Sequence, residues 1–357
     1  MQYIFNGLLS LESISKILVL EKGVVWKGVF FSVLMTMFIT IISLNGCNTN
    51  KEIKDDEQNQ AKQEIQLDNG ACINEISGGY NILSIKENEY TSINNERFIL
   101  SYNKNSGSYL YISNKSYYIH YNGSDIELSD KNVQAPLFSP DGKYLFYFSK
   151  DQYLQPVIYD LKNSERLELK INSSISGTYA TWFGNDKIIY YGVKKDSKTS
   201  GMFSYDLKSN QEKLEEEISG GYVSFIKAFK SKIIFFMESY SGEKSLKSLD
   251  NNGNIEVISD NVAEIYDIEM IDDSIYLLGR MTDNVYSLYD LSKDKRLIFD
   301  FPSKVMFEKG LSHTDKGEIL FIGNNDGSTS EKIYACSDNS IYVINSDSGD
   351  YTFIEIN

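Results

Sequence analysis

The chain has few of the residues from which most catalytic sites are built. It contains two histidines, three cysteines and four arginines in 357 residues. His120 and His313 are too far apart in sequence to form a spaced pair of metal ligands. No Gly-x-Ser-x-Gly nucleophile motif is present, and the scarcity of arginine argues against an active site built on an arginine cluster. We therefore expect no catalytic residue, no metal and no cofactor, and we predict that the protein is not an enzyme.

Helical periodicity and proline are also scarce. After residue 70 no helical pattern of useful length appears, which argues against a fold of alternating strands and helices. Only 4 prolines interrupt the chain, whereas 26 tyrosines and 19 phenylalanines suit pleated, half-buried surfaces. These features predict an all-β protein.

One stretch, residues 135–169, contains a complete unit of four short strands. The sequence predicts these strands at Ala135–Ser139, Tyr144–Ser149, Val157–Asp160 and Glu165–Leu169. Pro140-Asp141-Gly142-Lys143 forms the first turn, because proline presets φ and glycine accepts a positive φ.

The same pattern recurs along the chain. The turn before each long hydrophobic strand falls near Arg97, Lys143, Lys187, Lys232, Ser274 and Glu318, so that the steps are 46, 44, 45, 42 and 44 residues. A period of about 40–45 residues with four strands in each unit is typical of a β-propeller. A large β-sandwich is the alternative, but a sandwich does not need such regular spacing.

The blade number is less clear from the sequence. Counting from Phe98–Tyr102 as the first long strand gives six blades, and seven is the alternative. Extra strand-like segments occur at Ser108–Ser113, Ser116–Tyr121 and Lys332–Ser337. We expect them in the blade that closes the ring, with closing strands from residues 79–85 and 351–356.

The segment APLFSPDGKYLFYFS, residues 135–149, resembles the repeat of the TolB-type propellers. The same repeat occurs in the propeller domain of prolyl oligopeptidases. The resemblance covers roughly residues 75–357 and implies a six-bladed propeller. Peptidases that share this propeller carry catalysis on a separate hydrolase domain, and lyases built on related propellers hold a metal with clustered histidines. We expect neither feature in this protein.

The N-terminal region resembles the signal of a bacterial lipoprotein. Val29–Leu44 is an uncharged apolar run of 16 residues after Lys22 and Lys27, short for a membrane span and suited to a signal peptide. It ends in Leu44-Asn45-Gly46-Cys47, which resembles a lipobox. We expect residues 1–46 to be removed and Cys47 to carry diacylglycerol and acyl chains such as palmitate. An ordinary N-terminal anchor helix is the alternative.

Residues 1–27 are longer than the usual start of a signal peptide. We hypothesise that translation begins near Val24 or Val25. After Cys47, residues 48–70 contain no aromatic residue and many Gln, Asn and charged residues. Such a segment cannot bury enough surface to fold, so we expect residues 47–70 to tether a propeller of residues 71–357 to the extracytoplasmic face of the cell membrane.

The net charge restricts the partners. The chain carries −15, and the first 46 residues contribute +1, which leaves −16 on the mature part. This charge argues against nucleic acid and anionic lipid head groups as partners. Cationic peptides, metal ions and neutral glycans remain open as partners. The simplest explanation is that the negative charge only keeps the protein soluble. We expect a monomer.

Two further cysteines lie near the ends of the repeat region. Cys72 precedes the first repeat and Cys336 lies in the last, and closure of a propeller brings the chain ends together. A disulfide between them suits an oxidising compartment; two unpaired thiols are the alternative. The turn-like segments at residues 250–253 and 325–327 lack the full ligand spacing of a calcium loop, so hairpin turns explain them.

Two functions remain open at this point. The first is a binding or scaffold lipoprotein whose propeller holds a protein, peptide or glycan. The second is a hydrolase or lyase that acts on surface polysaccharide through carboxylates near the central channel. Two carboxylates on one face, about 5–10 Å apart, would be needed for that chemistry.

Overall fold

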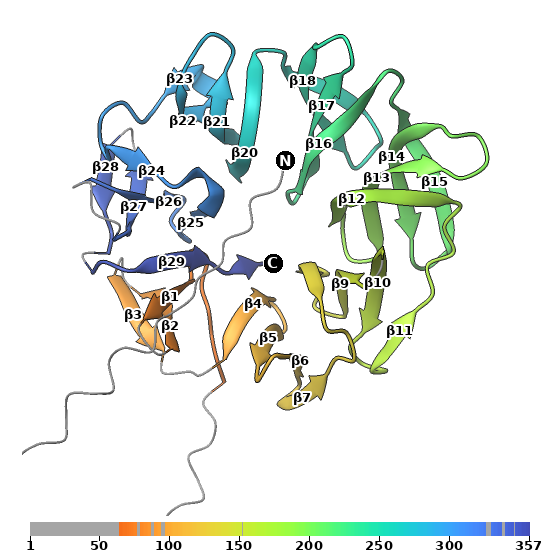
Figure 1. Ribbon diagram of the computed structural model, residues 1–357, viewed down its shortest axis with the longest axis horizontal. Coiled ribbons are helices and arrows are strands. Elements are labelled where there is room, and N and C mark those ends of the chain that lie inside the picture. Colours follow the sequence, from red (N-terminus) through yellow and green to blue (C-terminus); the bar gives the residue numbers. More distant parts are fainter. Residues whose placement is uncertain are drawn as a thin grey trace, which may run out of the picture. The chain divides into compact units, whose positions relative to one another are not determined.

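The computed structural model describes residues 64–357 apart from residues 77–78, 87–88, 94–96, 152, 326–329, 338–339 and 346. The described strands form seven sheets around a common axis (Figure 1). This arrangement is a β-propeller, as the sequence predicts. Residues 1–63, with the predicted signal, Cys47 and most of the tether, lie outside the described part. The described residues contain no helix with the length and apolar character that crossing a membrane requires.

Blades 3 to 6 each consist of four consecutive strands that meander outward from the axis. Blade 3 contains β8 (Val133–Phe138), β9 (Tyr144–Lys150), β10 (Leu154–Asp160) and β11 (Glu165–Leu167). Blade 4 contains β12 (Ser173–Trp182), β13 (Lys187–Lys194), β14 (Ser200–Asp206) and β15 (Gln211–Glu217). Blade 5 contains β16 (Gly221–Ala228), β17 (Lys232–Ser239), β18 (Lys244–Asp250) and β19 (Ile255–Ser259). Blade 6 contains β20 (Val262–Ile271), β21 (Ser274–Met281), β22 (Tyr286–Asp290) and β23 (Lys295–Arg296), with the 3-10 helix η1 (Leu291–Lys293) before β23.

The remaining three blades depart from this plan. Blade 7 has an inner strand split into β24 (Lys304–Val305) and β25 (Leu311–His313), separated by the 3-10 helix η2 (Phe307–Lys309), and continues with β26 (Ile319–Asn324), β27 (Lys332–Ser337) and β28 (Ser340–Val343). Blade 1 combines β29 (Asp350–Phe353) with β1 (Cys72–Ile76), β2 (Gly79–Lys86) and β3 (Glu89–Ile93). Blade 2 contains β4 (Phe98–Tyr102), β5 (Tyr109–Ser113), β6 (Ser116–Tyr121) and β7 (Ser124–Glu127), with β30 (Glu355–Ile356) added to β4.

Seven blades, rather than six, are therefore present among the described residues. The count from the sequence took Phe98–Tyr102 as the second strand of a blade. In the structure this segment is β4, which is the first of the four consecutive strands of blade 2. The second strands of blades 1 to 3 begin at residues 72, 109 and 144, only 37 and 35 residues apart, whereas later blades repeat every 42 to 45 residues. Because these two intervals are shorter than the others, the regular period does not extend to blades 1 and 2, and the count from the sequence misses one blade.

The extra strand-like segments take ordinary places in their own blades. Ser108–Ser113 and Ser116–Tyr121 correspond to β5 and β6 of blade 2, and Lys332–Ser337 is β27 of blade 7. Ring closure is instead made by β29, which pairs antiparallel with β1, Cys72 lying opposite Phe353. The C-terminal closing strand is thus as predicted, but its direct partner is β1 rather than the predicted segment at residues 79–85.

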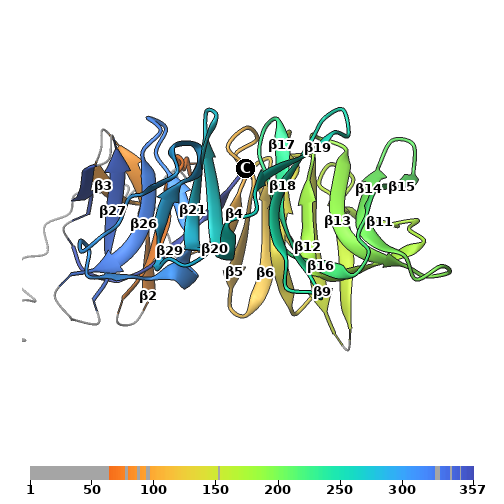
Figure 2. The same ribbon diagram turned by 90° about the horizontal axis from the view of Figure 1, so that it is seen from above.

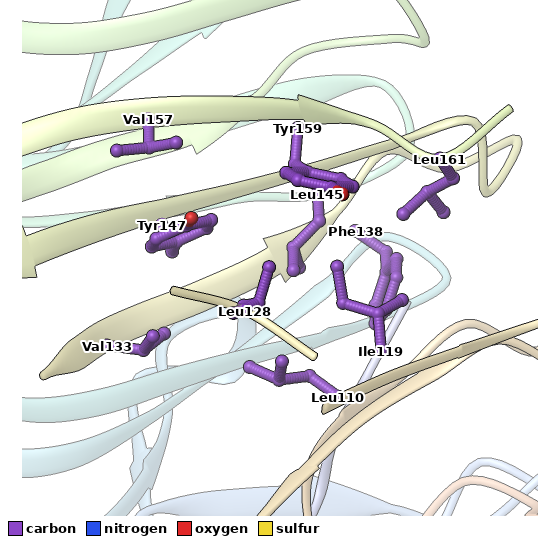
Figure 3. Close-up of a cluster of buried hydrophobic side chains, with 10 residues drawn as sticks. All are labelled: Leu110, Ile119, Leu128, Val133, Phe138, Leu145, Tyr147, Val157, Tyr159 and Leu161. Carbon is purple, nitrogen blue, oxygen red and sulfur yellow. The ribbon is translucent and has the colours of Figure 1, made fainter. Parts of the chain in front are cut away.

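The core lies between neighbouring blades, where the faces of adjacent sheets pack together. The cluster in Figure 3 joins Leu110, Ile119 and Leu128 of blade 2 to residues of blade 3. Phe138 and Leu145 lie at its centre and are 1% and 0% exposed. Phe138 therefore points between the adjacent sheets of blades 2 and 3.

The two faces of the propeller differ in the turns that they carry. In four blades a residue at the end of the second strand, or directly after it, donates a backbone hydrogen bond to the carbonyl just before the first strand, as in Lys150 to Asn132 (3.0 Å) and Tyr240 to Gly220 (2.7 Å). These turns and the links between blades therefore lie together on one face, which we call the entry face. The opposite face, where inner strands end, is the exit face, and the strands run between the two in Figure 2.

The segment before β1 packs against the exit face. Leu67 is 2% exposed, and the Tyr102 hydroxyl donates to the carbonyl of Ile65 (3.2 Å). The Lys104 ammonium lies 3.4 Å from Asp68 and 2.8 Å from Asp315 in the turn after β25. Ile65, Leu67 and Asp68, which the sequence assigns to the tether, therefore pack on the propeller.

Candidate functional site

Charged side chains from the inner strands of three blades meet near the axis. Lys227 comes from β16, Asp267 and Glu269 from β20, and His313 from β25. The Lys227 Nζ lies 3.0 Å from Asp267 Oδ1 and 3.4 Å from Glu269 Oε2. We call these residues, together with Glu355 of β30, the inner-strand cluster.

The local sequence of β20 explains how its two carboxylates come to lie together. Side chains alternate between the two faces of a strand. Ile268 is fully buried in the core between blades 5 and 6, so Asp267 and Glu269 on either side of it share the opposite face. Irregularities in the pairing of β20 with β21, on both sides of Ile265, add to the local bend.

Backbone donors hold both carboxylates in place. Asp267 accepts hydrogen bonds from the backbone N–H groups of Leu311 and Ile268, each at 2.8 Å. A side chain at Gly310 would place its Cβ only 2.9 Å from Asp267 Oδ2, and the φ of Gly310 is +71°. Glycine at this position therefore allows β25 to approach β20 closely enough for Leu311 to bond Asp267.

The pKa values of the cluster differ in direction. Burial acts to raise the pKa of Glu269, but Lys227 and His313 outweigh it and lower this pKa to about 2. Burial would lower the pKa of Lys227, yet Asp267, Glu269 and Glu355 hold it above its ordinary value. The enclosing protein, Asp267 and Glu269 together raise the pKa of Glu355, although water reaches its side chain.

His313 lies in a strand and not in an exposed turn. It ends β25 and is partly buried. Its Nδ1 lies 3.7 Å from Glu269 Oε1, too far for a hydrogen bond. His120, the other histidine, lies in blade 2, where its Nδ1 is 2.6 Å from Asp125 Oδ1.

Three aromatic side chains form a second feature beside the inner-strand cluster, which we call the aromatic triad. The Phe307 ring centroid lies 5.3 Å from that of Tyr266 and 5.7 Å from that of Tyr286. Tyr266 and Tyr286 are 45% and 43% exposed. Tyr266 directly precedes Asp267 on β20, and Phe307 begins η2, three residues before Gly310. The triad and the inner-strand cluster thus share the same two chain segments.

Polar neighbours fix the outer edge of the triad. The Arg280 guanidinium lies over the Tyr286 ring, 5.5 Å from its centroid, and 3.8 Å from Glu264. The Tyr286 hydroxyl donates to the same carboxylate. Tyr286 directly follows the turn between β21 and β22, so it lies at the entry face. Tyr153, Tyr240 and Phe299, which are 76%, 78% and 63% exposed, lie in turns and links on this face as well.

A hollow of about 800 Å³ lies on the entry face between blades 5 and 6. Its lining includes Lys244, Asp260, Arg280 and Thr282, which are mixed in charge. None of the cluster's carboxylates lines it. The hollow is therefore separate from the inner-strand cluster.

The residues predicted as sites from the sequence lie elsewhere. Cys72 and Cys336 are buried free thiols in different clusters: Cys72 packs between blades 7 and 1, and Cys336 between blades 6 and 7. Because the sheet of blade 7 lies between these clusters, the suggested disulfide is not formed. Cys47 is outside the described residues.

The turn at residues 250–253 is a hairpin turn, as predicted. The Asp250 carboxylate accepts the backbone N–H groups of Asn252 and Asn254, each at 2.8 Å. Residues 326 and 327 of the other calcium-like segment lie outside the described part. Across the described ranges no group of three or more His, Cys, Asp or Glu side chains is arranged to hold a metal ion.

The aromatic triad and the inner-strand cluster were not identified from the sequence. Carboxylates near the channel were considered only as a class. The available signal was the segment Tyr266–Met270, YDIEM, which places two carboxylates inside an inner strand where other blades have neutral residues at most positions.

Comparison with known proteins identifies the fold and nothing finer. No known family and no curated protein matches the sequence. Among solved structures, dipeptidyl peptidase 4 of Porphyromonas gingivalis is 12% identical with a TM-score of 0.51, over 80% of this chain and 55% of that one. A structure from a study of two prolyl endopeptidases is 12% identical with a TM-score of 0.52, over 68% and 42%. TolB of Acinetobacter baumannii is 13% identical with a TM-score of 0.43, over 79% and 64%.

The chain therefore spans about two fifths to two thirds of the length of these structures. At such low identity the likeness concerns the β-propeller alone.

Proposed function

We propose that the protein is a binding lipoprotein, anchored through Cys47 at the extracytoplasmic face of a membrane, whose propeller holds a protein, peptide or glycan partner. The aromatic triad on the entry face carries this proposal. Tyrosine and phenylalanine dominate the centres of recognition surfaces, because they offer large contact area at low entropic cost. Tyr266 and Tyr286 are exposed beside Phe307, which is partly buried against the core between blades 6 and 7, and exposed apolar groups on a folded body commonly mark such a surface.

The charged residues favour binding over catalysis. A hydrolase needs one carboxyl that can give up a proton and one that is free to act as base. Asp267 and Glu269 are instead held by Lys227 and by backbone N–H groups. The contrast between the lowered pKa of Glu269 and the raised pKa of Glu355 is the one observation in favour of a hydrolase or lyase of surface polysaccharide.

Phe307→Ala is expected to abolish capture of the native partner. The full chain, purified in detergent, serves as bait for surface fractions of its own organism. Loss of the central ring removes a hot-spot contact, which should weaken binding by at least about 2 kcal/mol. Tyr153→Ala, at an exposed aromatic far from the triad, is the matched control and should capture as the native chain does. Equal capture by both variants would contradict the proposal, and release of reducing ends from polysaccharide that Glu355→Gln abolishes would support the enzymatic alternative.

Cys47→Ser is expected to eliminate lipidation. The variant should accumulate as an unprocessed precursor or appear in the medium, because one thioether-linked lipid is the membrane anchor that we propose. Metabolic labelling with an alkyne fatty acid measures the change, and Cys72→Ser is the control that should retain the label. Equal labelling of the native chain and the Cys47→Ser variant would refute the anchor.

A further inference from the structure

We infer that the partner presents a basic peptide segment, with aromatic or aliphatic side chains that lie on the aromatic triad and a lysine or arginine that reaches the carboxylates of the inner-strand cluster. This inference rests on the proposed binding function and specifies the chemistry of its ligand.

The apolar and acidic features adjoin each other at Tyr266 and Asp267. Tyr266 and Asp267 are consecutive on β20. On the facing segment Phe307 packs on Tyr266, while Leu311 bonds Asp267. A ligand that covers the triad therefore lies within one or two residue lengths of Asp267, from which the other carboxylates of the inner-strand cluster continue toward the ends of the inner strands.

The charge of this surface is unbalanced. Five carboxylates belong to it, and they are Glu264, Asp267, Glu269, Glu308 and Glu355. Three permanent cations oppose them, Lys227, Arg280 and Lys309, and Lys309 also pairs with Glu331 and Asp350 outside this set. The excess of negative charge complements a cationic ligand, and the −15 charge of the whole chain steers such ligands toward it.

Glu355 is the carboxylate best placed to receive a cation. No described lysine, arginine or histidine nitrogen lies within 4.0 Å of it, and water reaches its side chain. The enclosing protein, with Asp267 and Glu269, raises its pKa against the opposing effect of Lys227, so its ionised form is stabilised less than an isolated carboxylate would be. A ligand cation that arrives there relieves this repulsion.

The triad itself is too tightly packed to be a cage for a cation. Its ring centroids are 5.3 to 6.0 Å apart, which leaves the rings in contact with one another. They present a surface for apolar stacking, and the positive charge of the ligand must therefore be met by the carboxylates. This division of roles requires a ligand with both kinds of side chain, as a peptide has.

Three labelled peptides test the inference: GKFKFKG, GSFSFSG and GEFEFEG, each carrying fluorescein. Fluorescence anisotropy with the full chain in detergent should show tightest binding for the lysine peptide. Raising the salt concentration should weaken that binding, because ionic screening reduces the attraction. Glu355→Gln should weaken binding of the lysine peptide about tenfold, since a charge-assisted hydrogen bond is lost, and should leave the serine peptide unchanged.

Control variants distinguish the contribution of the carboxylates to peptide binding from that of the aromatic rings. Phe307→Ala should weaken all peptides that bind, and Tyr153→Ala should change none. Melting curves show whether each variant is folded, and Glu308→Gln replaces Glu355→Gln if the latter unfolds. Equal affinity for the lysine and serine peptides would overturn the inference, whereas the proposed function would stand if Phe307→Ala still prevented capture of the native partner. If the partner is a glycan, Phe307→Ala should still prevent capture of the native partner, and none of the three peptides should bind.

Discussion

Removal of residues 351–357 is expected to destabilise the whole propeller, not merely to shorten it. The deletion takes away most of β29, the strand that completes blade 1, and leaves the edge of β1 unpaired. It also removes Tyr351, which is 0% exposed in a core cluster with Cys72, Ile322 and Ile333. Loss of one such aromatic side chain alone costs about 3–5 kcal/mol.

Thermal melting measures this effect. We expect the midpoint to fall by about 10 °C or more, with aggregation of the unpaired edge. Thr352→Ala is the matched control, because Thr352 lies on the same strand with its side chain exposed, and its midpoint should stay within about 2 °C of the native value. An unchanged midpoint for the deletion would mean that β29 is not needed for closure.

Phe138→Ala is expected to lower the free energy of unfolding by about 3–5 kcal/mol, the usual cost of a large-to-small change in a core. Phe138 lies between blades 2 and 3 and packs with Ile119 and Leu145 (Figure 3). The cavity would therefore open at a junction that holds two sheets together.

Denaturant unfolding of the full chain in detergent measures this cost. Phe299→Ala, at a ring that is 63% exposed, is the control and should change stability by less than about 0.5 kcal/mol. A cost below about 1 kcal/mol for Phe138→Ala would contradict the packing between the blades.

The sequence predicts the propeller well where each blade follows the common plan. In blade 3 the four predicted strands match β8 to β11 within a few residues, because turn residues such as Gly142, whose φ is +66°, mark the ends of the strands. It predicts less well where pairing depends on distant segments. Nothing local in Phe98–Tyr102 distinguishes an inner strand from a second strand, since both are short and apolar.

The candidate site is harder to predict for a related reason. Lys227, Asp267 and His313 come from three blades, and no local pattern shows that their inner strands converge. The contact of Leu311 with Asp267 spans 44 residues and depends on Gly310 and on η2, which interrupts an inner strand. Such an interruption leaves no periodic signal. The sequence therefore indicates the kind of site, carboxylates near the axis, but not its members.

The pairing of β29 with β1 also sets an order of assembly. Cys72 lies opposite Phe353, which is 281 residues later in the chain. The ring therefore cannot close until almost the whole chain has been synthesised. Contacts between such distant residues fold slowly and expose strand edges in the meantime. An export route that keeps the chain unfolded until it is complete would prevent β1 from pairing with another molecule first.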